Sequence, residues 1–223
     1  MQEVNIPIIL QAGLSSRRKD FVDYLLMAKS RLESFAHNYG WQHLTEKAFV
    51  DTWEIYDDKK AFDRRICEMA GMPIDTELPV TYSAVLEQRI LISVTPELYR
   101  QNYPQGDEAE AFSKLLCHEM AHRLHIRILD GNEEAMGPVW FYEGFALFSA
   151  GQFEHSFQPL TKDKLLAMFS EHERGNYQHY AYAFRQLAIM AESFQEFIFW
   201  PSQPDFELSL NRLLQQNFQI REG

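Results

Sequence analysis

The amino-acid sequence predicts an α+β fold in which a small N-terminal α/β lobe with a mixed sheet precedes a mostly helical lobe. Runs rich in β-branched and aromatic residues stand at 48–56 and 89–94, both in the first half of the 223-residue chain. From residue 107 onward, apolar residues recur at spacings of three and four, as on amphipathic helices. No internal repeat or low-complexity linker separates the halves. We therefore predict one domain, 1–223, made of lobes 1–106 and 107–223.

The N-terminal lobe is expected to alternate strands with helices. Phe21, Leu25 and Leu32 lie on one helical stripe, and Gly40 is a usual stop signal. Asp57 or Asp58 can cap the following helix. The expected elements are an edge strand or docking tail at 6–10, a helix at 18–39, a strand at 48–56, a helix at 58–70 ended by Gly71, extended segments at 80–86 and 89–94, and a helical turn from Pro96.

The helical lobe is expected to begin with a helix at 107–129. Asp107 is its predicted N-cap and Glu110 stands at the capping-box position. Gly137-Pro138 starts the next helix, because proline suits the first helical position, and Gly151 ends it. The remaining predicted helices are 161–170, opened by Thr161 or Asp163, then 177–193 and 205–217.

Composition and charge exclude several classes of protein. The formal net charge is −11, whereas binding nucleic acid or an anionic membrane requires a basic surface. No apolar run approaches the roughly 18 residues of a membrane-spanning helix, and the N-terminus lacks the basic segment and long apolar core of a signal peptide. Cys67 and Cys117 do not suggest a disulfide framework, and Cys117 is expected to pack. We expect a soluble, cytoplasmic protein without a nucleic-acid partner or a membrane span.

The segment His118-Glu119-Met120-Ala121-His122 is the centre of the functional prediction. Residues four apart on an α-helix lie on the same face, one turn from each other, so both imidazoles face the same way. Two neutral imidazoles at this spacing can hold one zinc ion, and Glu119 can reach a water molecule bound to that ion.

Glu143 is the predicted third ligand. It lies within the aromatic and aliphatic stretch 140–147, where an isolated carboxylate would be costly to bury and a cation would offset that cost. The 20 residues between His122 and Glu143 suffice for one helix to end and a second to pack against it. Together with His118 they offer two nitrogens and one oxygen, as in catalytic zinc sites. The alternative is two histidines on a solvated helix face and a surface glutamate.

His118-Glu-Met-Ala-His122 followed by Trp140-Phe-Tyr-Glu-Gly-Phe-Ala146 resembles the gluzincin metallopeptidases, and among them the aminopeptidase N-like and peptidase MA-like catalytic domains. The resemblance implies a thermolysin-like zincin fold with one zinc ion in the cleft between the lobes. It also implies an edge strand that binds extended peptide by main-chain pairing. The segment 89–94 stands where that strand is expected, and a place in the centre of the sheet is the alternative.

The resemblance also assigns roles in catalysis. Glu119 matches the general base, which takes a proton from the attacking water and returns it to the leaving amine. A group from the helical lobe stabilises the oxyanion in such enzymes. Gln178-His179-Tyr180-Ala181-Tyr182 resembles the Gln-Ser-Tyr-Ala segment of peptidase MA-like domains, which gives that role to Tyr180. Tyr182 and His179 are alternatives, and a core tyrosine is the other interpretation of Tyr180.

The group that orients the zinc-binding histidines is not apparent from the sequence. In thermolysin a carboxylate four residues after the third ligand has this function, but Leu147 stands at that position here. Glu133 and Glu134 are therefore the candidates. His125 lies on the same helix face as the predicted ligands and is expected to be exposed, with a contact to the site or substrate as the alternative.

These observations predict a zinc metallopeptidase acting on peptide or protein substrates. The amine-binding glutamate segment of the aminopeptidase branch is missing upstream of His118, so aminopeptidase specificity is not predicted. One alternative is a catalytically weak or inactive zincin-fold binding module. A lesser one is a metal-dependent amidase acting on a non-peptide substrate. The intact Glu119 favours catalysis.

Overall fold

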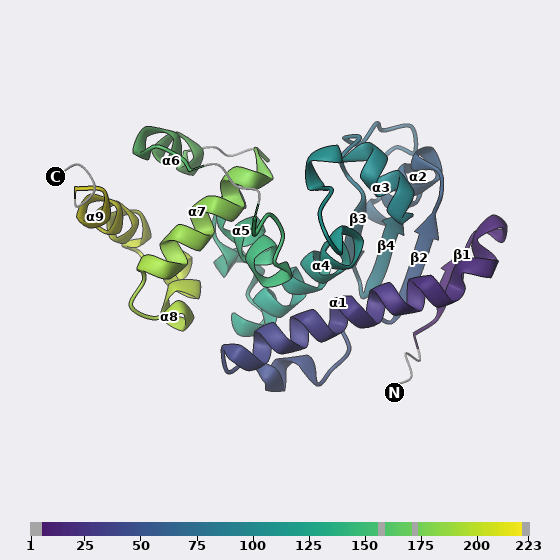
Figure 1. Ribbon diagram of the computed structural model, residues 1–223, viewed down its shortest axis with the longest axis horizontal. Helices are drawn as coiled ribbons and strands as arrows, with labels where there is room; N and C mark the ends of the chain where they lie inside the picture. The colour runs from purple at the N-terminus through teal and green to yellow at the C-terminus, as the bar shows by residue number, and fades with distance from the viewer. Residues whose placement is uncertain (1–5, 156–158, 171–173, 220–223) are drawn as a thin grey trace.

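The computed structural model describes residues 6–155, 159–170 and 174–219. Figure 1 shows a small sheet at one side of the molecule and a group of helices at the other. This arrangement confirms the predicted α+β class, with a mixed sheet in the N-terminal part and a mostly helical C-terminal part. The lobe boundary at residue 106 stays a prediction. Residues 1–5, which contribute to the prediction that there is no signal peptide, lie outside the described part of the chain.

The helices follow the predicted order closely. They are α1 (Arg18–Asn38), α2 (Lys59–Ala70), α3 (Pro96–Asn102), α4 (Ala111–Ile128), α5 (Val139–Ala150), α6 (Lys162–Phe169), α7 (Tyr177–Met190), α8 (Phe194–Ile198) and α9 (Phe206–Gln219). The short helix α8 is not predicted by the sequence pattern. Ser193, placed inside the predicted helix 177–193, instead caps α8 by accepting a hydrogen bond from the amide of Glu196.

In the part of the chain that the structure describes, the sheet contains four strands in the order β1 (Ile8–Leu10), β2 (Thr52–Tyr56), β4 (Ile90–Val94), β3 (Ala84–Glu87). The first three run parallel, and β3 runs antiparallel to β4. Helices cover both faces. Trp53 packs against Phe21 of α1 and Phe112 of α4 on one face, whereas Glu54 pairs with Arg65 of α2 at 2.8 Å on the other.

The prediction that 89–94 forms the peptide-binding edge strand is wrong. This segment is β4, which lies between β2 and β3. Leu91, Ile92 and Val94 are fully buried. Because consecutive side chains in a strand point to opposite faces, β4 is covered on both faces, as is typical of an interior strand. Within the described residues β3 pairs with β4 alone, so β3 is the edge strand on this side, and β1 forms the other edge as predicted.

Three helix ends confirm the predicted capping residues. At the start of α2, Asp58 accepts a hydrogen bond from the amide of Ala61 at 2.8 Å. Thr161 caps α6 in the same way. Gly151 ends α5 in the left-handed conformation, with a φ of 66°, which glycine adopts without the steric cost of a Cβ.

The predicted capping of α4 is wrong. The helix begins at Ala111, after Glu110 in a left-handed conformation with a φ of 60°, and no side chain caps it. Asp107 is engaged elsewhere, because its carboxylate accepts a hydrogen bond from Arg100 at 3.0 Å. The N-terminal end of α4 is held instead by an ion pair between Lys114 and Glu108 at 3.1 Å.

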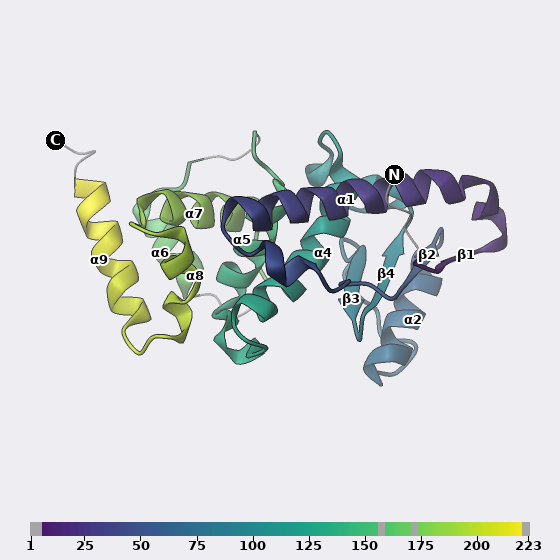
Figure 2. The same cartoon turned by 90° about the horizontal axis from the view of Figure 1, so that it is seen from below.

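Helix α1 connects the sheet with the helical part. Figures 1 and 2 show it running along the molecule from the sheet towards α5 and α8. Near its start Phe21 contacts Trp53 in the sheet, and near its end Phe35 contacts Phe145 of α5 and Phe194 of α8. One hydrophobic core therefore extends through both parts of the fold.

Both cysteines, Cys67 and Cys117, are buried free thiols, whereas a disulfide framework would require them to be paired. Cys117 is fully buried in α4, in agreement with its predicted packing role. In the described ranges, no helix has the length and apolar character that crossing a lipid bilayer would require.

The crossing of α5 and α7 depends on Gly144, the residue after the predicted ligand Glu143. A Cβ atom at Gly144 would lie 2.6 Å from Cβ of Phe184 in α7. That atom is fixed to the backbone of α7, so the helices would have to separate. The small residue thus permits the close approach that holds α5 in place.

We predict that Gly144→Ala lowers the free energy of unfolding by about 1–3 kcal/mol, the usual cost of overpacking a core. Chemical denaturation of the purified variant measures this. Gly13→Ala is the matched control, because the nearest atom to its added Cβ is 3.9 Å away; its effect should stay within about 0.5 kcal/mol. Equal stability of Gly144→Ala and the wild type would contradict the assigned packing role.

Candidate metal centre

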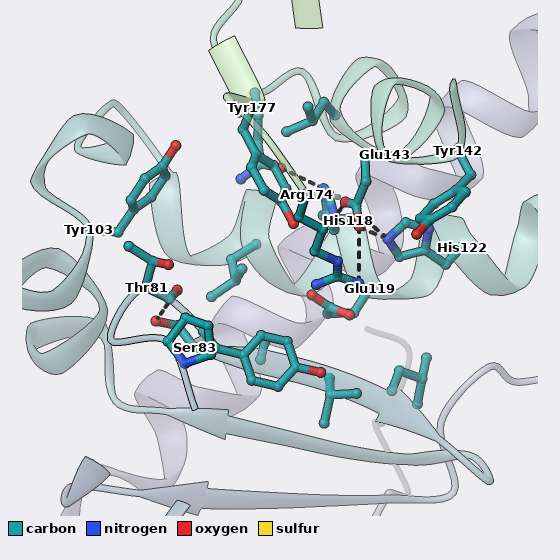
Figure 3. Close-up of a pocket in the computed structure, with 18 of the residues that line it drawn as sticks. Thr81, Ser83, Tyr103, His118, Glu119, His122, Tyr142, Glu143, Arg174 and Tyr177 are labelled. Carbon is teal, nitrogen blue, oxygen red and sulfur yellow. Dashed lines mark hydrogen bonds and ion pairs between the residues drawn. The ribbon is translucent and has the colours of Figure 1, made fainter. Parts of the chain in front are cut away.

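Three side chains from two packed helices, His118 and His122 of α4 and Glu143 of α5, meet at one point. The Nε2 atoms of the histidines lie 3.1 Å apart. Glu143 Oε2 lies 3.1 Å from Nε2 of His118 and 3.6 Å from Nε2 of His122. His118 and Glu143 are buried, whereas His122 is partly exposed at the wall of a cavity, as Figure 3 shows.

The three atoms are spaced as ligands of one small cation. Zinc bonds of about 2.0–2.2 Å at tetrahedral angles place neighbouring ligand atoms about 3.4 Å apart. The observed separations of 3.1, 3.1 and 3.6 Å lie on either side of that value. One ion could therefore reach all three atoms.

The protons on His118 support the same conclusion. Its Nδ1 lies 2.9 Å from Oε1 of Gln152, and an amide oxygen only accepts hydrogen bonds, so Nδ1 carries a hydrogen. In the neutral ring the other nitrogen then has a free lone pair. That lone pair faces a carboxylate oxygen and a second imidazole nitrogen. Three electron-rich atoms that converge in this way fit a bound cation.

Gln152 is the supporting residue that the sequence analysis missed. The glutamates predicted for this role lie in the turn before α5, where Glu133 pairs with Arg123 at 3.6 Å. Gln152 follows Gly151, whose left-handed conformation ends α5, and it is buried beside His118 of α4. Burial raises the pKa of the Tyr99 hydroxyl, and a hydrogen bond with Gln152 opposes this rise.

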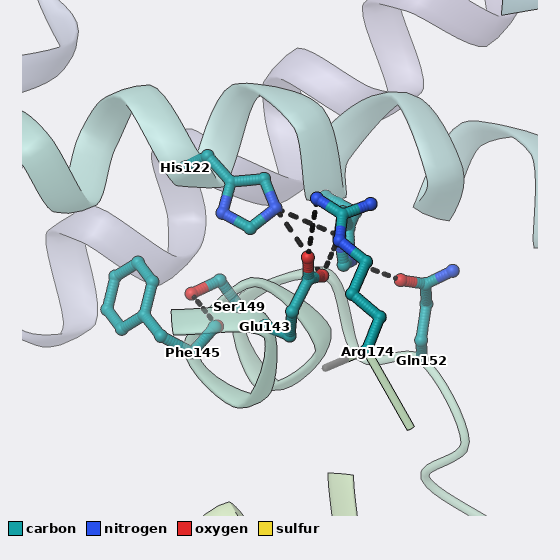
Figure 4. A network of polar contacts seen from close by, with 7 residues as sticks. His122, Glu143, Phe145, Ser149, Gln152 and Arg174 are labelled. Carbon is teal, nitrogen blue, oxygen red and sulfur yellow. Dashed lines mark hydrogen bonds and ion pairs between the residues drawn. The ribbon is translucent and has the colours of Figure 1, made fainter. Parts of the chain in front are cut away.

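Glu143 is held in its ionised form. Burial alone would raise its pKa, but the hydrogen bonds and charges of His118 and His122 outweigh burial and hold the pKa well below the usual value. Its second oxygen, Oε1, lies 3.2 Å from Nη2 of Arg174. Figure 4 shows the carboxylate between the imidazole and the guanidinium.

Glu119 stands beside the triad and lines the cavity. Figure 3 shows its carboxylate close to the triad, on the side that faces the strands. Burial raises the pKa of Glu119 to about 7; His118 opposes this rise and Glu143 adds to it. A carboxylate with such a pKa is suited to accept and return a proton near neutral pH.

The cavity in front of the triad has a volume of about 780 Å³. Its floor is formed by consecutive residues of the edge strand β3 and the residue before it, from Ser83 to Glu87. Its other walls include residues of α4 and α5, the segment leading into α7, the loop before β3, and the turns that carry Gln105 and Glu133. The predicted ligands and general base therefore meet at a cavity large enough for several residues of an extended chain.

The tyrosines of α7 differ in their surroundings. Tyr180 is buried, and its hydroxyl accepts a hydrogen bond from the amide of Gly175 at 2.5 Å. Tyr177 lines the cavity, with its ring centroid 6.2 Å from that of His118. Tyr182 is also buried, and His179 is partly exposed. The catalytic role of Tyr180 stays a prediction, and Tyr177 is the α7 tyrosine that lines the cavity beside the triad.

The expectation that His125 is exposed is wrong. Its side chain is fully buried and stacks on Phe145, with ring centroids 4.3 Å apart. Neither ring nitrogen has a hydrogen-bond partner among the described residues. Burial lowers the pKa of His125 to about 3, and His122 adds to this fall. His125 is thus a neutral aromatic side chain of the core.

Comparison with protein-family models, curated proteins and solved structures finds no match to this chain. The resemblance to gluzincins consequently depends on the site alone: a buried His118, His122 and Glu143 triad compatible with an HExxH…E zinc site.

We predict that Gln152→Leu weakens zinc binding about 10- to 100-fold, the usual effect of removing a partner of a metal-bound histidine. Competition titration against a fluorescent chelator measures this. Gln105→Leu is the matched control, since Gln105 is an exposed residue of the same cavity. Equal zinc affinity in Gln152→Leu and the wild type would show that the hydrogen bond to His118 does not support the metal.

We also predict that His125→Phe raises the free energy of unfolding of metal-free protein by about 1 kcal/mol or more, because it removes two buried nitrogens without partners.

The unfolded chain binds a proton at this histidine below about pH 6.5, whereas the folded chain does not until about pH 3. The free energy of unfolding of the wild type therefore decreases as the pH falls from about 6.5 to about 3. His125 contributes up to about 1.4 kcal/mol per pH unit to this decrease. Denaturation between pH 7 and pH 4 should show a shallower loss in His125→Phe. Parallel curves would contradict the buried, neutral state.

Proposed function

We propose that this protein is a zinc-dependent peptidase that hydrolyses peptide bonds with the assistance of Glu119. The observation that carries the proposal is the position of Glu119. It is a proton acceptor that lines the cavity next to a His-His-Glu triad, with an edge strand opposite. These are the components that water-mediated cleavage of an extended chain requires.

His118, His122 and Glu143 would hold the ion through two nitrogens and one oxygen. A zinc ion bound in this way would act as a Lewis acid and would lower the pKa of a bound water molecule to about 7. Ferrous iron also binds two histidines and a carboxylate in oxygenases. Glu119 favours zinc, because a carboxylate poised to take a proton from water serves hydrolysis.

Glu119 would act twice. It accepts a proton from water as the water oxygen attacks the carbonyl carbon, and it then delivers that proton to the leaving nitrogen. In the metal-free site, burial beside Glu143 raises the pKa of Glu119 to about 7, because desolvation disfavours the charged form.

The substrate would lie along β3. The strand pairs on one side with β4, and the residues from Ser83 to Glu87 line the cavity. An extended peptide can add to a free strand edge through main-chain hydrogen bonds, which bind the backbone without selecting the side chains. This mode of binding supports a peptide or protein substrate over a small amide.

The proposal predicts that Glu119→Gln reduces the turnover of peptides at least about 10³-fold, within the range attributed to general bases, and leaves one zinc bound. A fluorogenic peptide library measures cleavage, and elemental analysis measures the metal. Glu133→Gln is the control, because Glu133 lines the same cavity but pairs with Arg123. It should retain wild-type turnover.

Two results would count against a peptidase. Zinc-loaded wild-type protein that cleaves no member of a broad library would leave a metal-stabilised binding module as the better description. Full activity in Glu119→Gln would show that another group accepts the proton.

A further inference from the structure

Arg174 brings a positive charge to the triad from the cavity side. It lies just before α7 and extends over the cavity, with its guanidinium carbon 5.9 Å from the ring centroid of Tyr82. Its Nη2 is 3.2 Å from Oε1 of Glu143. The side chain is 52 % exposed, so one part of it faces the open cavity. Figures 3 and 4 show it directed at the triad from the cavity side.

The two oxygens of Glu143 have different neighbours. Oε2 faces the histidine nitrogens, whereas Oε1 faces Arg174. An ion held through Oε2 would therefore leave the contact between Oε1 and Arg174 in place. The guanidinium carries several further N–H donors, and Figure 3 shows it between Glu143 and Glu119. A carbonyl group that approached the triad from the cavity would therefore pass beside the guanidinium.

The other arginine of the cavity is in a different situation. Arg123 lines the wall and pairs with Glu133 at 3.6 Å. Arg174 is paired with a carboxylate that also faces two histidines. If a divalent ion were bound in the triad, the negative charges of Glu143 and Glu119 would balance its two positive charges. The positive charge of Arg174 would then be available to stabilise an anionic group at the reaction centre.

We propose that Arg174 is a catalytic residue that donates hydrogen bonds to the oxyanion formed on the scissile carbonyl oxygen. This inference rests on the proposed hydrolysis. The water oxygen bonds to the carbonyl carbon, its proton passes to Glu119, and the C=O π pair moves to the carbonyl oxygen beside Arg174. The C=O bond then re-forms, the C–N bond breaks, and the proton from Glu119 goes to the nitrogen. Arg174 stays protonated throughout.

An arginine suits this task better than the tyrosine predicted for it. The hydroxyl of Tyr180 accepts a hydrogen bond from the amide of Gly175, and Tyr180 is not among the residues that line the cavity. A guanidinium is always charged, and hydrogen bonds from charged donors are about twice as strong as neutral ones. The ion pair with Glu143 and the contact with the ring of Tyr82 place it beside the triad before the charge develops, which is the condition for electrostatic catalysis.

The test uses zinc-loaded Arg174→Gln, with Arg123→Gln as the matched control. Inorganic phosphate serves as a tetrahedral anion probe that requires no knowledge of the substrate. Calorimetric titration should show about tenfold or greater loss of phosphate affinity in Arg174→Gln and a change within about twofold in Arg123→Gln. Zinc affinity should be similar in all three proteins.

Turnover gives the second measurement. Arg174→Gln should lower kcat about 10²- to 10³-fold, as loss of one oxyanion donor does, with a much smaller change in KM. Added guanidinium ion at millimolar concentration should restore part of the activity of Arg174→Ala and none in Glu119→Gln. A residue with a merely structural role would not be replaced by a free guanidinium.

The outcomes separate this inference from the proposed function. If no peptide is cleaved by the wild type, the peptidase assignment fails, and the phosphate titration still decides the anion-binding role of Arg174. If peptides are cleaved but Arg174→Gln keeps wild-type kcat, Arg174 is not catalytic and the peptidase assignment stands. Unchanged phosphate affinity with raised zinc affinity would overturn the inference, because Arg174 would then only neutralise Glu143.

Discussion

The structure depends on the burial of one carboxylate between two packed helices. Glu143 is 1 % exposed, and an isolated carboxylate in such a place would cost several kcal/mol. Two imidazoles on one side and a guanidinium on the other offset that cost. Because α5 carries Glu143 and α4 carries both histidines, the packing of these helices and the assembly of the site are the same event. A metal ion would add to the stability of the fold as well as supply chemistry.

The surrounding fold is arranged to keep this contact in register. Gly144 lets α7 lie close against α5, and α1 connects α5 with the sheet through Phe35 and Phe21. Gln152 follows the left-handed Gly151 and holds the ring of His118. The orientation of the nitrogen that faces the centre of the triad is thus set by residues far apart in the sequence, as is typical of metal sites with a supporting hydrogen bond.

The sequence predicted the features that follow from local spacing. The histidines of α4, the proline and glycine at the ends of α5 and the capping of α2 by Asp58 all depend on residues within one or two helical turns. The capping of α4 is a local prediction that is wrong, and the other errors lie where tertiary contacts decide. The place of 89–94 inside the sheet depends on pairing with β2 and β3. The burial of His125 depends on α5, and the partner of His118 comes from 34 residues away. Arg174 carries no sequence motif, and only the fold brings it to Glu143.

X-ray absorption spectroscopy of zinc-loaded protein tests the central claim most directly, since it reports the atoms bound to the metal. We predict about two nitrogens from imidazole at about 2.0–2.1 Å and a carboxylate oxygen at about 2.0–2.2 Å, with no sulfur, and loss of the histidine pattern in His118→Ala. A sulfur shell near 2.3 Å, or a shell of oxygens alone, would show that the ion is held elsewhere and would contradict the triad as the metal site.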